Sequence, residues 1–330
     1  MKPYHKTKLG RLYYGSCLEL HEAIESGSVD LILTDLPYGT INNIGDSESI
    51  KHGMKNKTGW DFIIEPKQVY EIANRVLRKN GKMILFSQEP YTNRLITESI
   101  PNVPFSYRMI WEKDHFANSL IAKKAPVSYF EDILVFSKGK HGTYGEDDSY
   151  REYLNRERKK FNITLDEMCG ICGLNIKGHG GAAYHWCSSK QPSMIPEKHY
   201  NTLRNETGLF NKPYVELKDI YIKSFEKYQS IFKLWQGSKY KSNILKYKKD
   251  YNGYHTAQKP ILLIEDLIKT FSNEGNLVVD LTCGSGTTCV ACERTNRKWI
   301  GIEKELKYTE ISAKRIEAEA SQLKLFKEKP

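Results

Sequence analysis

Short apolar runs that end at turn-forming residues recur towards both ends of this chain. The clearest is residues 29–34, which are followed by Asp35, Pro37 and Gly39. A β-branched apolar run that stops at proline and glycine predicts a buried strand followed by a tight loop. In open α/β sheets the ligand crevice lies beyond the carboxyl ends of the strands. Residues 35–38 are therefore the first candidates for chemistry.

Other segments show similar periodicities. Short apolar runs predict strands over residues 11–14, 82–87, 107–111, 133–137, 276–281 and 299–303. An apolar face, with Pro66 in the first turn and Gly81 suited to the C-terminal cap, predicts a helix over residues 66–80. A second helix is expected after Pro260. Residues 42–58 show no periodicity and predict a mobile loop beside Asp35.

The pattern changes between residues 139 and 254, where helical patches replace strands. Residues 138–254 hold 21 Lys and Arg against 13 Asp and Glu, a net charge of +8, and 12 of the 21 tyrosines. Cations interleaved with tyrosines suit a nucleic-acid surface, because lysine and arginine meet phosphates and aromatic rings meet bases. A solvated helical surface is the alternative interpretation.

Two helices are expected in this region, one starting after Thr164 in capping-box spacing with Glu167 and one over residues 196–206. Such a pair would fit a helix-turn-helix-like DNA reader. A zinc site is the competing interpretation, with candidate ligands Cys169, Cys172, His179, His185 and Cys187. Zinc needs four ligands in a closed set, and the second half is not a paired motif, so we expect no metal.

Composition narrows the function classes. The chain has 330 residues, 39% hydrophobic residues, a net charge of +10 and a pI near 9.0, which favours an anionic partner. No apolar run approaches the ~20 residues that span a bilayer, and the first residues lack the apolar segment of a signal peptide. Seven cysteines without such a signal predict reduced thiols and a cytoplasmic protein.

A second candidate site follows the strand expected at residues 276–281. The segment continues into a glycine-rich turn and a helix start, and Glu303 ends the next expected strand. Glycines let the backbone approach a ligand, and a helix N-terminus presents free N–H groups. A carboxylate at the tip of the following strand is the usual partner of ribose hydroxyls. This pattern alone does not separate NAD from S-adenosylmethionine.

Taken together, the two candidate sites resemble those of the amino-group DNA methyltransferases that use S-adenosylmethionine. The family's D/S/N-P-P-Y motif corresponds to residues 35–38, and its FxGxG-type cofactor motif to residues 280–288. Residues 255–260 (HTAQKP) resemble the HPTQKP segment that precedes the cofactor strand. In the β class of this family the catalytic motif comes first, the insert second and the cofactor motif last, which is the order found here. Leu36 and Thr282 depart from the family pattern.

The resemblance implies a Rossmann-like, doubly wound and mostly parallel α/β fold with a mainly helical insert. It implies a catalytic domain of residues 1–138 and 255–330 and a target-recognition insert of residues 139–254. The base would be flipped from the duplex, stacked on Tyr38, and held by Asp35 and the Leu36 carbonyl, while Pro37 stiffens the loop. Transfer would be direct, so no cysteine nucleophile is needed.

The same resemblance implies S-adenosylmethionine as cofactor and names its site. The expected cofactor residues are Ser16, Cys17, Lys259, Asp280, Thr282, Gly284, Ser285, Gly286, Thr287 and Glu303. Within that set the glycines admit the methionine moiety, Asp280 and Lys259 organise its polar end, and Glu303 takes the ribose. The expected phosphate contacts on double-stranded DNA are Lys246, Lys248 and Lys249.

Several alternatives stay open. Aspartate at position 35 favours adenine N6 over cytosine N4, without deciding between them. An inactive DNA-binding protein on a methyltransferase fold would explain Leu36 and Thr282, but not the intact Asp35 and Tyr38. A dinucleotide-dependent oxidoreductase leaves residues 35–39 and the basic insert unexplained. Methylation of RNA or protein stays open as an alternative, but the large insert favours duplex DNA. A homodimer and a cognate restriction endonuclease remain open as partners.

Overall fold

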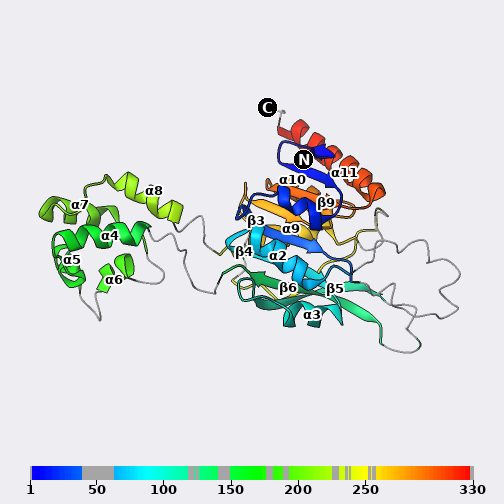
Figure 1. Cartoon of the computed structure of the whole chain (residues 1–330), viewed down its shortest axis with the longest axis horizontal. Coiled ribbons are helices and arrows are strands. Elements are labelled where there is room, and N and C mark those ends of the chain that lie inside the picture. Colours follow the sequence, from blue (N-terminus) through cyan, green and yellow to red (C-terminus); the bar gives the residue numbers. More distant parts are fainter. Residues whose placement is uncertain are drawn as a thin grey trace. The chain divides into compact units, whose positions relative to one another are not determined.

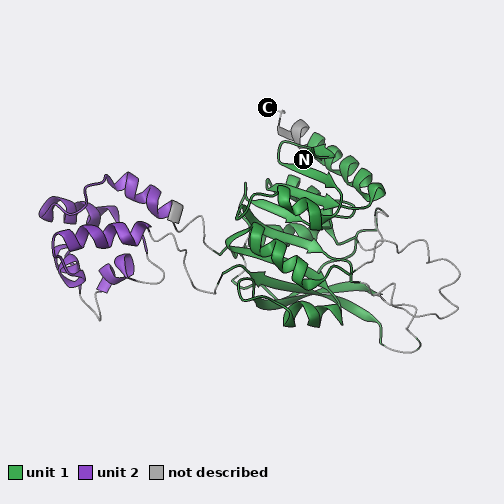
Figure 2. Cartoon of the chain, in the orientation of Figure 1, with its two compact units in different colours: residues 1–140, 230–330 green, residues 141–229 purple. Residues whose placement is uncertain are grey.

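The computed structural model describes residues 2–38, 63–117, 123, 126–139, 149–175, 181–188, 193–224, 230–234, 237, 239–251, 254 and 258–327. The chain divides into two compact units, residues 1–140 with 230–330 and residues 141–229 (Figure 2). The first unit carries the β-sheet, and the second consists of helices and their connections (Figure 1).

The sheet of the first unit has the order β1-β2-β9-β8-β3-β4-β6-β5-β7. Its strands are β1 (His5–Lys6), β2 (Gly10–Tyr14), β3 (Val29–Asp35), β4 (Leu77–Ser87), β5 (Phe105–Ala117), β6 (Ser128–Ser137), β7 (Ile244–Lys246), β8 (Leu277–Asp280) and β9 (Lys298–Glu303). The neighbouring strands β2, β9, β8, β3 and β4 run parallel to one another, whereas β6 is antiparallel to both of its neighbours. The mostly parallel sheet expected from the sequence is confirmed.

Helices cover both faces of this sheet. One face packs against α1 (Cys17–Leu20), α2 (Pro66–Val76) and α3 (Tyr91–Thr97). The 3-10 helix η1 (His21–Ala23) follows α1 and has no buried residue. The other face packs against α9 (Ile261–Phe271), α10 (Thr287–Arg294) and α11 (Leu306–Lys327). In β3, Leu31 and Leu33 face the second set while Ile32 faces the first. Burial on both faces explains why three consecutive apolar residues, Leu31, Ile32 and Leu33, form the middle of β3.

The parallel pairing of β3 with β8 joins two distant parts of the chain. Leu31 pairs with Val278 and Ile32 with Val279, so both strands end at the same edge of the sheet. The hydroxyl of Thr34 crosses between them and donates to Asp280 Oδ1 at 2.8 Å. The two candidate motifs therefore lie side by side.

The second unit contains α4 (Ser149–Lys160), α5 (Leu165–Ile171), α6 (Gly181–Cys187), α7 (Glu197–Thr207) and α8 (Tyr214–Ser224). It has a separate apolar core, in which Cys169 and Cys187 are buried. The expected capping box of Thr164 and Glu167 is present at the start of α5. However, α6 lies between the two expected helices in the chain, so they are not a consecutive helix-turn-helix pair. His179 lies outside the described residues.

Two boundaries differ from the sequence expectation. The helix expected over residues 66–80 ends at Val76, and Gly81 belongs to β4. A Cβ on Gly81 would lie 3.1 Å from the Val29 carbonyl, so glycine permits close approach of two strands there instead of capping a helix. The compact helical unit ends at residue 229, before the expected 254, because β7 pairs with β5 of the sheet.

Two further sequence expectations concern the loop and the membrane. The loop expected over residues 42–58 lies outside the described residues. Among the helices that the structure describes, none is long and apolar enough to cross a membrane.

Adjacent leucines of α9 test its packing on the sheet. Leu263 is fully buried, whereas Leu262 is 60% exposed. Leu263→Ala is expected to lower the free energy of unfolding by about 2–5 kcal/mol, because it leaves a cavity. Leu262→Ala is expected to change it by less than about 0.5 kcal/mol. Urea unfolding measures both, and equal losses would contradict this placement of α9.

Candidate active site

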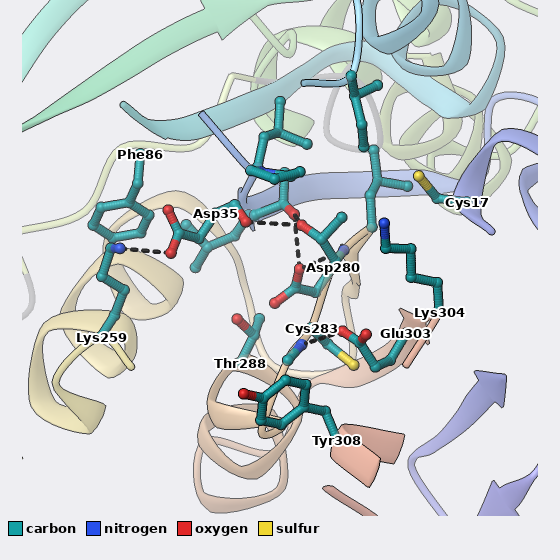
Figure 3. A pocket seen from close by; sticks show the side chains of 18 of the residues that line it. Cys17, Asp35, Phe86, Lys259, Asp280, Cys283, Thr288, Glu303, Lys304 and Tyr308 are labelled. Carbon is teal, nitrogen blue, oxygen red and sulfur yellow. Dashed lines mark hydrogen bonds and ion pairs between the residues drawn. The ribbon is translucent and has the colours of Figure 1, made fainter. Parts of the chain in front are cut away.

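A cavity of about 460 Å³ lies at the carboxyl ends of β3, β8 and β9. Residues of both candidate motifs line it, and the N-terminus of α1 contributes Ser16 and Cys17. Figure 3 shows Asp35 and Asp280 facing this space from neighbouring strands, with Lys259 beside Asp35 and Glu303 on the side of the glycine turn. One cavity therefore joins the two sites that the sequence predicted separately.

Asp35 ends β3 and carries two strong contacts. The Tyr38 hydroxyl donates to Oδ1 at 2.5 Å, and Lys259 Nζ donates to Oδ2 at 2.5 Å. Burial raises the pKa of Asp35, and the ammonium of Lys259 opposes that rise. The side chain of Leu36 is buried in the core, so the backbone is what this position can offer a ligand in the cavity.

The glycine turn between β8 and α10 forms another wall. Gly284 and Gly286 have φ values of 52° and 79°, in the left-handed region that favours glycine. Gly284 N–H donates to Glu303 Oε2 at 2.8 Å, and Glu305 N–H donates to Glu303 Oε1 at 2.8 Å. Glu303 thus braces the turn while it lines the cavity. Burial raises the pKa of its carboxyl group.

Thr282, which departs from the family motif, links the two halves of the site. Its hydroxyl donates to the Asp35 carbonyl at 2.9 Å and lies 2.9 Å from the hydroxyl of Thr34. Asp280 accepts from Thr34 and from the Thr282 N–H. Burial raises the pKa of Asp280 to about 6, against the opposing effect of these hydrogen bonds. Asp280 therefore loses its charge as the pH falls through about 6.

Gln258 lines the cavity beside the glycine turn. Its Oε1 accepts from the Ser285 hydroxyl at 3.2 Å. Its Nε2 is buried and has no hydrogen-bond partner among the described residues. A buried donor without a partner suits an acceptor on a ligand. Arg315 supports the same turn by donating to the Ser285 carbonyl at 2.6 Å.

The family model described as DNA methylase matches residues 29–314 of this chain. The chain belongs to this family. The methylase is similar to the type II methyltransferase M2.LlaDCHI of Lactococcus lactis subsp. cremoris, with 33% identity over 96% of the chain and 92% of that protein. It is also 26% identical to the type II methyltransferase M.BamHI of Bacillus amyloliquefaciens. That match covers 92% of this chain but only 56% of the longer relative.

Solved structures show the same fold. The M1.HpyAVI–SAM complex has a TM-score of 0.50 at 16% identity and covers 93% of the methylase and 99% of that chain. The cytosine-N4-specific PvuII DNA methyltransferase has a TM-score of 0.50 at 17% identity and covers 98% of the methylase and 95% of that chain. At this identity the likeness supports the class I methyltransferase fold and does not assign residues.

The cavity of the methylase fits S-adenosylmethionine, which carries two positive centres, a carboxylate and a ribose. Asp280 and Glu303 supply carboxylates, and Gln258 supplies the unpartnered amide donor. Burial raises the pKa of the Cys17 thiol to about 11, so this residue lines the cavity as a neutral group. The other expected cofactor residues that line the cavity are Ser16, Lys259, Thr282, Gly284, Ser285 and Thr287.

Some expected site residues lie elsewhere or act differently. Lys259, expected at the cofactor, places its ammonium on Asp35. Gly286 is the N-cap of α10 and packs against α11, where a Cβ would lie 2.9 Å from Ser312 Oγ. The three lysines expected to contact phosphates lie in the first unit, outside the helical unit. Lys246 ends β7, and Lys248 and Lys249 follow that strand.

Three residues of the methylase site escaped sequence analysis: Lys113, Glu131 and Gln258. Glu131 lines the cavity 3.0 Å from Lys259, and Lys113 donates to Glu131 at 2.5 Å. The first two lie just outside the strands expected over residues 107–111 and 133–137, because β5 and β6 are longer than the apolar pattern predicts. Among the described residues, no cluster of His, Cys, Asp and Glu has a metal-binding arrangement.

Proposed function

We propose that this methylase transfers a methyl group from S-adenosylmethionine to the exocyclic amino group of a base flipped out of duplex DNA, in the first place adenine N6. The observation that carries the proposal is the shared cavity, in which the Asp35 carboxylate and the glycine turn braced by Glu303 face the same space. An amino-binding group and a cofactor-binding turn must meet in this way for direct transfer.

Bound S-adenosylmethionine would supply an electrophilic methyl group. The chain's own residues would prepare the amino group to receive it. Asp35 and the Leu36 carbonyl accept the amino hydrogens, which directs the nitrogen lone pair towards the methyl group. Tyr38 stacks on the base after flipping. As the N–C bond forms, the bond between the methyl group and the sulfonium sulfur would break, and its electron pair would stay on sulfur to leave a neutral thioether. The amino nitrogen becomes acidic in this step, and the Asp35 carboxylate is placed to take its proton.

Aspartate at position 35 favours adenine over cytosine. The cytosine-N4-specific PvuII DNA methyltransferase has a similar fold, so the fold itself does not select the base. The likeness to type II methyltransferases supports a place in a restriction-modification system, beside an endonuclease of the same specificity. An inactive DNA-binding protein is disfavoured because Asp35, Tyr38 and Glu303 all line the cavity.

The first test removes the amino acceptor. Asp35→Ala is expected to lower methyl transfer at least about 100-fold while cofactor binding persists, because the carboxylate acts on the base. Asp35→Asn is the matched control, since it keeps the shape and one acceptor oxygen and should retain more activity. Transfer of labelled methyl groups to DNA measures both variants, and calorimetry measures the cofactor. Near-normal transfer by Asp35→Ala would refute the role of Asp35.

The second test concerns Glu303. Glu303→Ala should weaken S-adenosylmethionine binding by about 2–4 kcal/mol if two charge-assisted bonds to the ribose are lost. The variant also frees the Gly284 and Glu305 N–H groups, so Glu303→Gln serves as a matched control that keeps an acceptor for the turn. Calorimetry gives the affinity and thermal unfolding gives the cost to the fold. Unchanged affinity in both variants would place the ribose elsewhere.

We further propose that residues 139–254 hold the DNA reader. The support is the net charge of +8 over residues 138–254 and the density of tyrosines in the same segment. The last turn of α4 contributes Arg158, Lys159 and Lys160, of which the two lysines are exposed. Outside the helical unit, Lys246 and Lys248 are exposed at and after β7. Such cations neutralise phosphates and set affinity, while contacts with base edges set specificity.

Salt titrations test the phosphate contacts. Each of Lys246→Ala and Lys248→Ala should weaken binding to all sequences alike and reduce the salt slope by about one. Lys67→Ala, which removes an exposed lysine of α2, is the control and should leave the slope unchanged. An unchanged slope in the two test variants would exclude these lysines as phosphate contacts.

The reader itself is tested by grafting residues 139–254 onto a related methyltransferase and sequencing the modified sites. We expect the chimaera to adopt the specificity of the graft. An active chimaera that keeps its original specificity would show that the insert is not the reader.

A further inference from the structure

Four charged side chains form a continuous buried chain that begins at Asp35. Lys259 Nζ lies 2.5 Å from Asp35 Oδ2 and 3.0 Å from Glu131 Oε2. Lys113 Nζ donates to Glu131 Oε1 at 2.5 Å. The side chains of Lys113, Lys259 and Glu131 are 4%, 6% and 11% exposed, and that of Asp35 is 26% exposed. The charges alternate in sign and sum to zero.

These four side chains come from three strands of the first unit and from the segment before α9. Asp35 ends β3, Glu131 lies on β6, Lys113 lies on β5, and Lys259 precedes the N-cap of α9, Pro260. Aromatic rings line the path: Lys259 Nζ is 5.2 Å from the centroid of Phe86, and Lys113 Nζ is 5.1 Å from that of Trp111. Buried charges in apolar surroundings are costly unless each is paired, so every member depends on its neighbours.

We propose that Lys259 and Glu131 are positioning residues for methyl transfer. Lys259 holds the Asp35 carboxylate ionised and aimed into the cavity, and Glu131, anchored by Lys113, holds the Lys259 ammonium in place. The inference rests on the proposed function of Asp35 as the acceptor of the amino hydrogens. It changes the role of Lys259, which the sequence placed at the cofactor.

The need for this arrangement follows from the burial of Asp35. A protonated carboxyl group donates one hydrogen bond and no longer offers two full acceptor oxygens to an amino group. Burial favours that neutral form, and the Lys259 ammonium favours the charged one. A carboxylate has about four lone-pair sites. The contacts with Tyr38 and Lys259 therefore leave capacity for amino hydrogens.

Glu131 has two opposing effects. Burial would lower the pKa of Lys259, but Asp35 and Glu131 together raise it, so the lysine stays charged. Glu131 is also a like charge that raises the pKa of Asp35. Its own pKa is lowered in spite of burial, because Lys259 and Lys113 lie against it.

Two further groups complete the surroundings of Asp35. Asp280 on the paired strand β8 is a second like charge, and the charge of Asp35 adds to the rise of the Asp280 pKa. The Tyr38 hydroxyl stabilises the carboxylate, and burial raises the pKa of that hydroxyl well above its usual range, so it stays a donor. Neither group changes in the variants below, so the effects of Lys259 and Glu131 can be separated.

The test is a pH titration of the Asp35 carboxyl group by NMR, in full-length protein labelled with ¹³C at aspartate carboxyl carbons and assigned through loss of the signal in Asp35→Asn. Lys259→Met should move the titration to higher pH, because a favourable positive charge is removed. Glu131→Gln should move it to lower pH, because a like charge is removed while the amide oxygen still accepts from Lys113. A general loosening of the site would not shift the Asp35 titration in opposite directions in the two variants.

Kinetics provide the second readout. The acid limb of kcat/KM for methyl transfer should shift in the same directions as the NMR titration, since it reports ionisation in the free enzyme. Lys259→Arg should restore most of the wild-type profile. Lys269→Met, which removes a lysine of α9 away from the cavity lining, should match wild type. S-adenosylmethionine should bind Lys259→Met within about threefold of the wild-type dissociation constant.

Three outcomes would decide against the inference. An Asp35 titration that does not move in Lys259→Met, a shift in the same direction for both variants, or a large loss of cofactor affinity with an unchanged pH profile would each overturn it. The last result would return Lys259 to the cofactor site. If the wild-type protein transferred no methyl group to DNA, the proposed function would fall, and the NMR titration would still decide whether Lys259 and Glu131 control the charge of Asp35.

Discussion

The site depends on the parallel pairing of β3 with β8. This pairing brings Asp35 and Asp280, which lie near opposite ends of the sequence, to one edge of the sheet. Thr34 and Thr282 join the two strand ends through their hydroxyl groups and hold the backbone of the first motif against the second. A shift in register of one residue would turn each inward side chain to the other face. The amino-binding and cofactor-binding groups would then no longer share a cavity.

The distribution of charge in the cavity follows from this strand pairing. Four acidic residues line one cavity, Asp35, Glu131, Asp280 and Glu303, and burial acts to raise the pKa of each. Lys259 offsets the charge at the Asp35 end, and backbone N–H groups offset it at the Glu303 end. The two ends therefore differ in character. The end with the fixed cation suits a neutral amino group, and the remaining carboxylates suit a cofactor that carries positive charge.

Local sequence signals predicted most of the catalytic unit. Apolar runs gave the strands at both motifs, and the glycines after β8 marked the turn correctly because their positive φ angles are a local requirement. Non-local contacts were not predictable in this way. Glu131 and Lys113 look like ordinary polar positions of strands, and only the pairing of β5 with β6 and the approach of Lys259 give them a role. The three-residue β7 was missed because its pairing with β5, and not its pattern, makes it a strand.

Methylation of an exocyclic amino group of a DNA base is the activity that we propose for the Asp35 cavity. The most direct measurement is to express the gene in a host without DNA methylation, digest its DNA to nucleosides and identify the modified base by mass spectrometry. We expect N6-methyladenine from the wild-type gene and none from the Asp35→Ala variant. N4-methylcytosine alone would contradict the choice of adenine, and unmodified DNA, or equal modification by the Asp35→Ala variant, would contradict the assignment of the site.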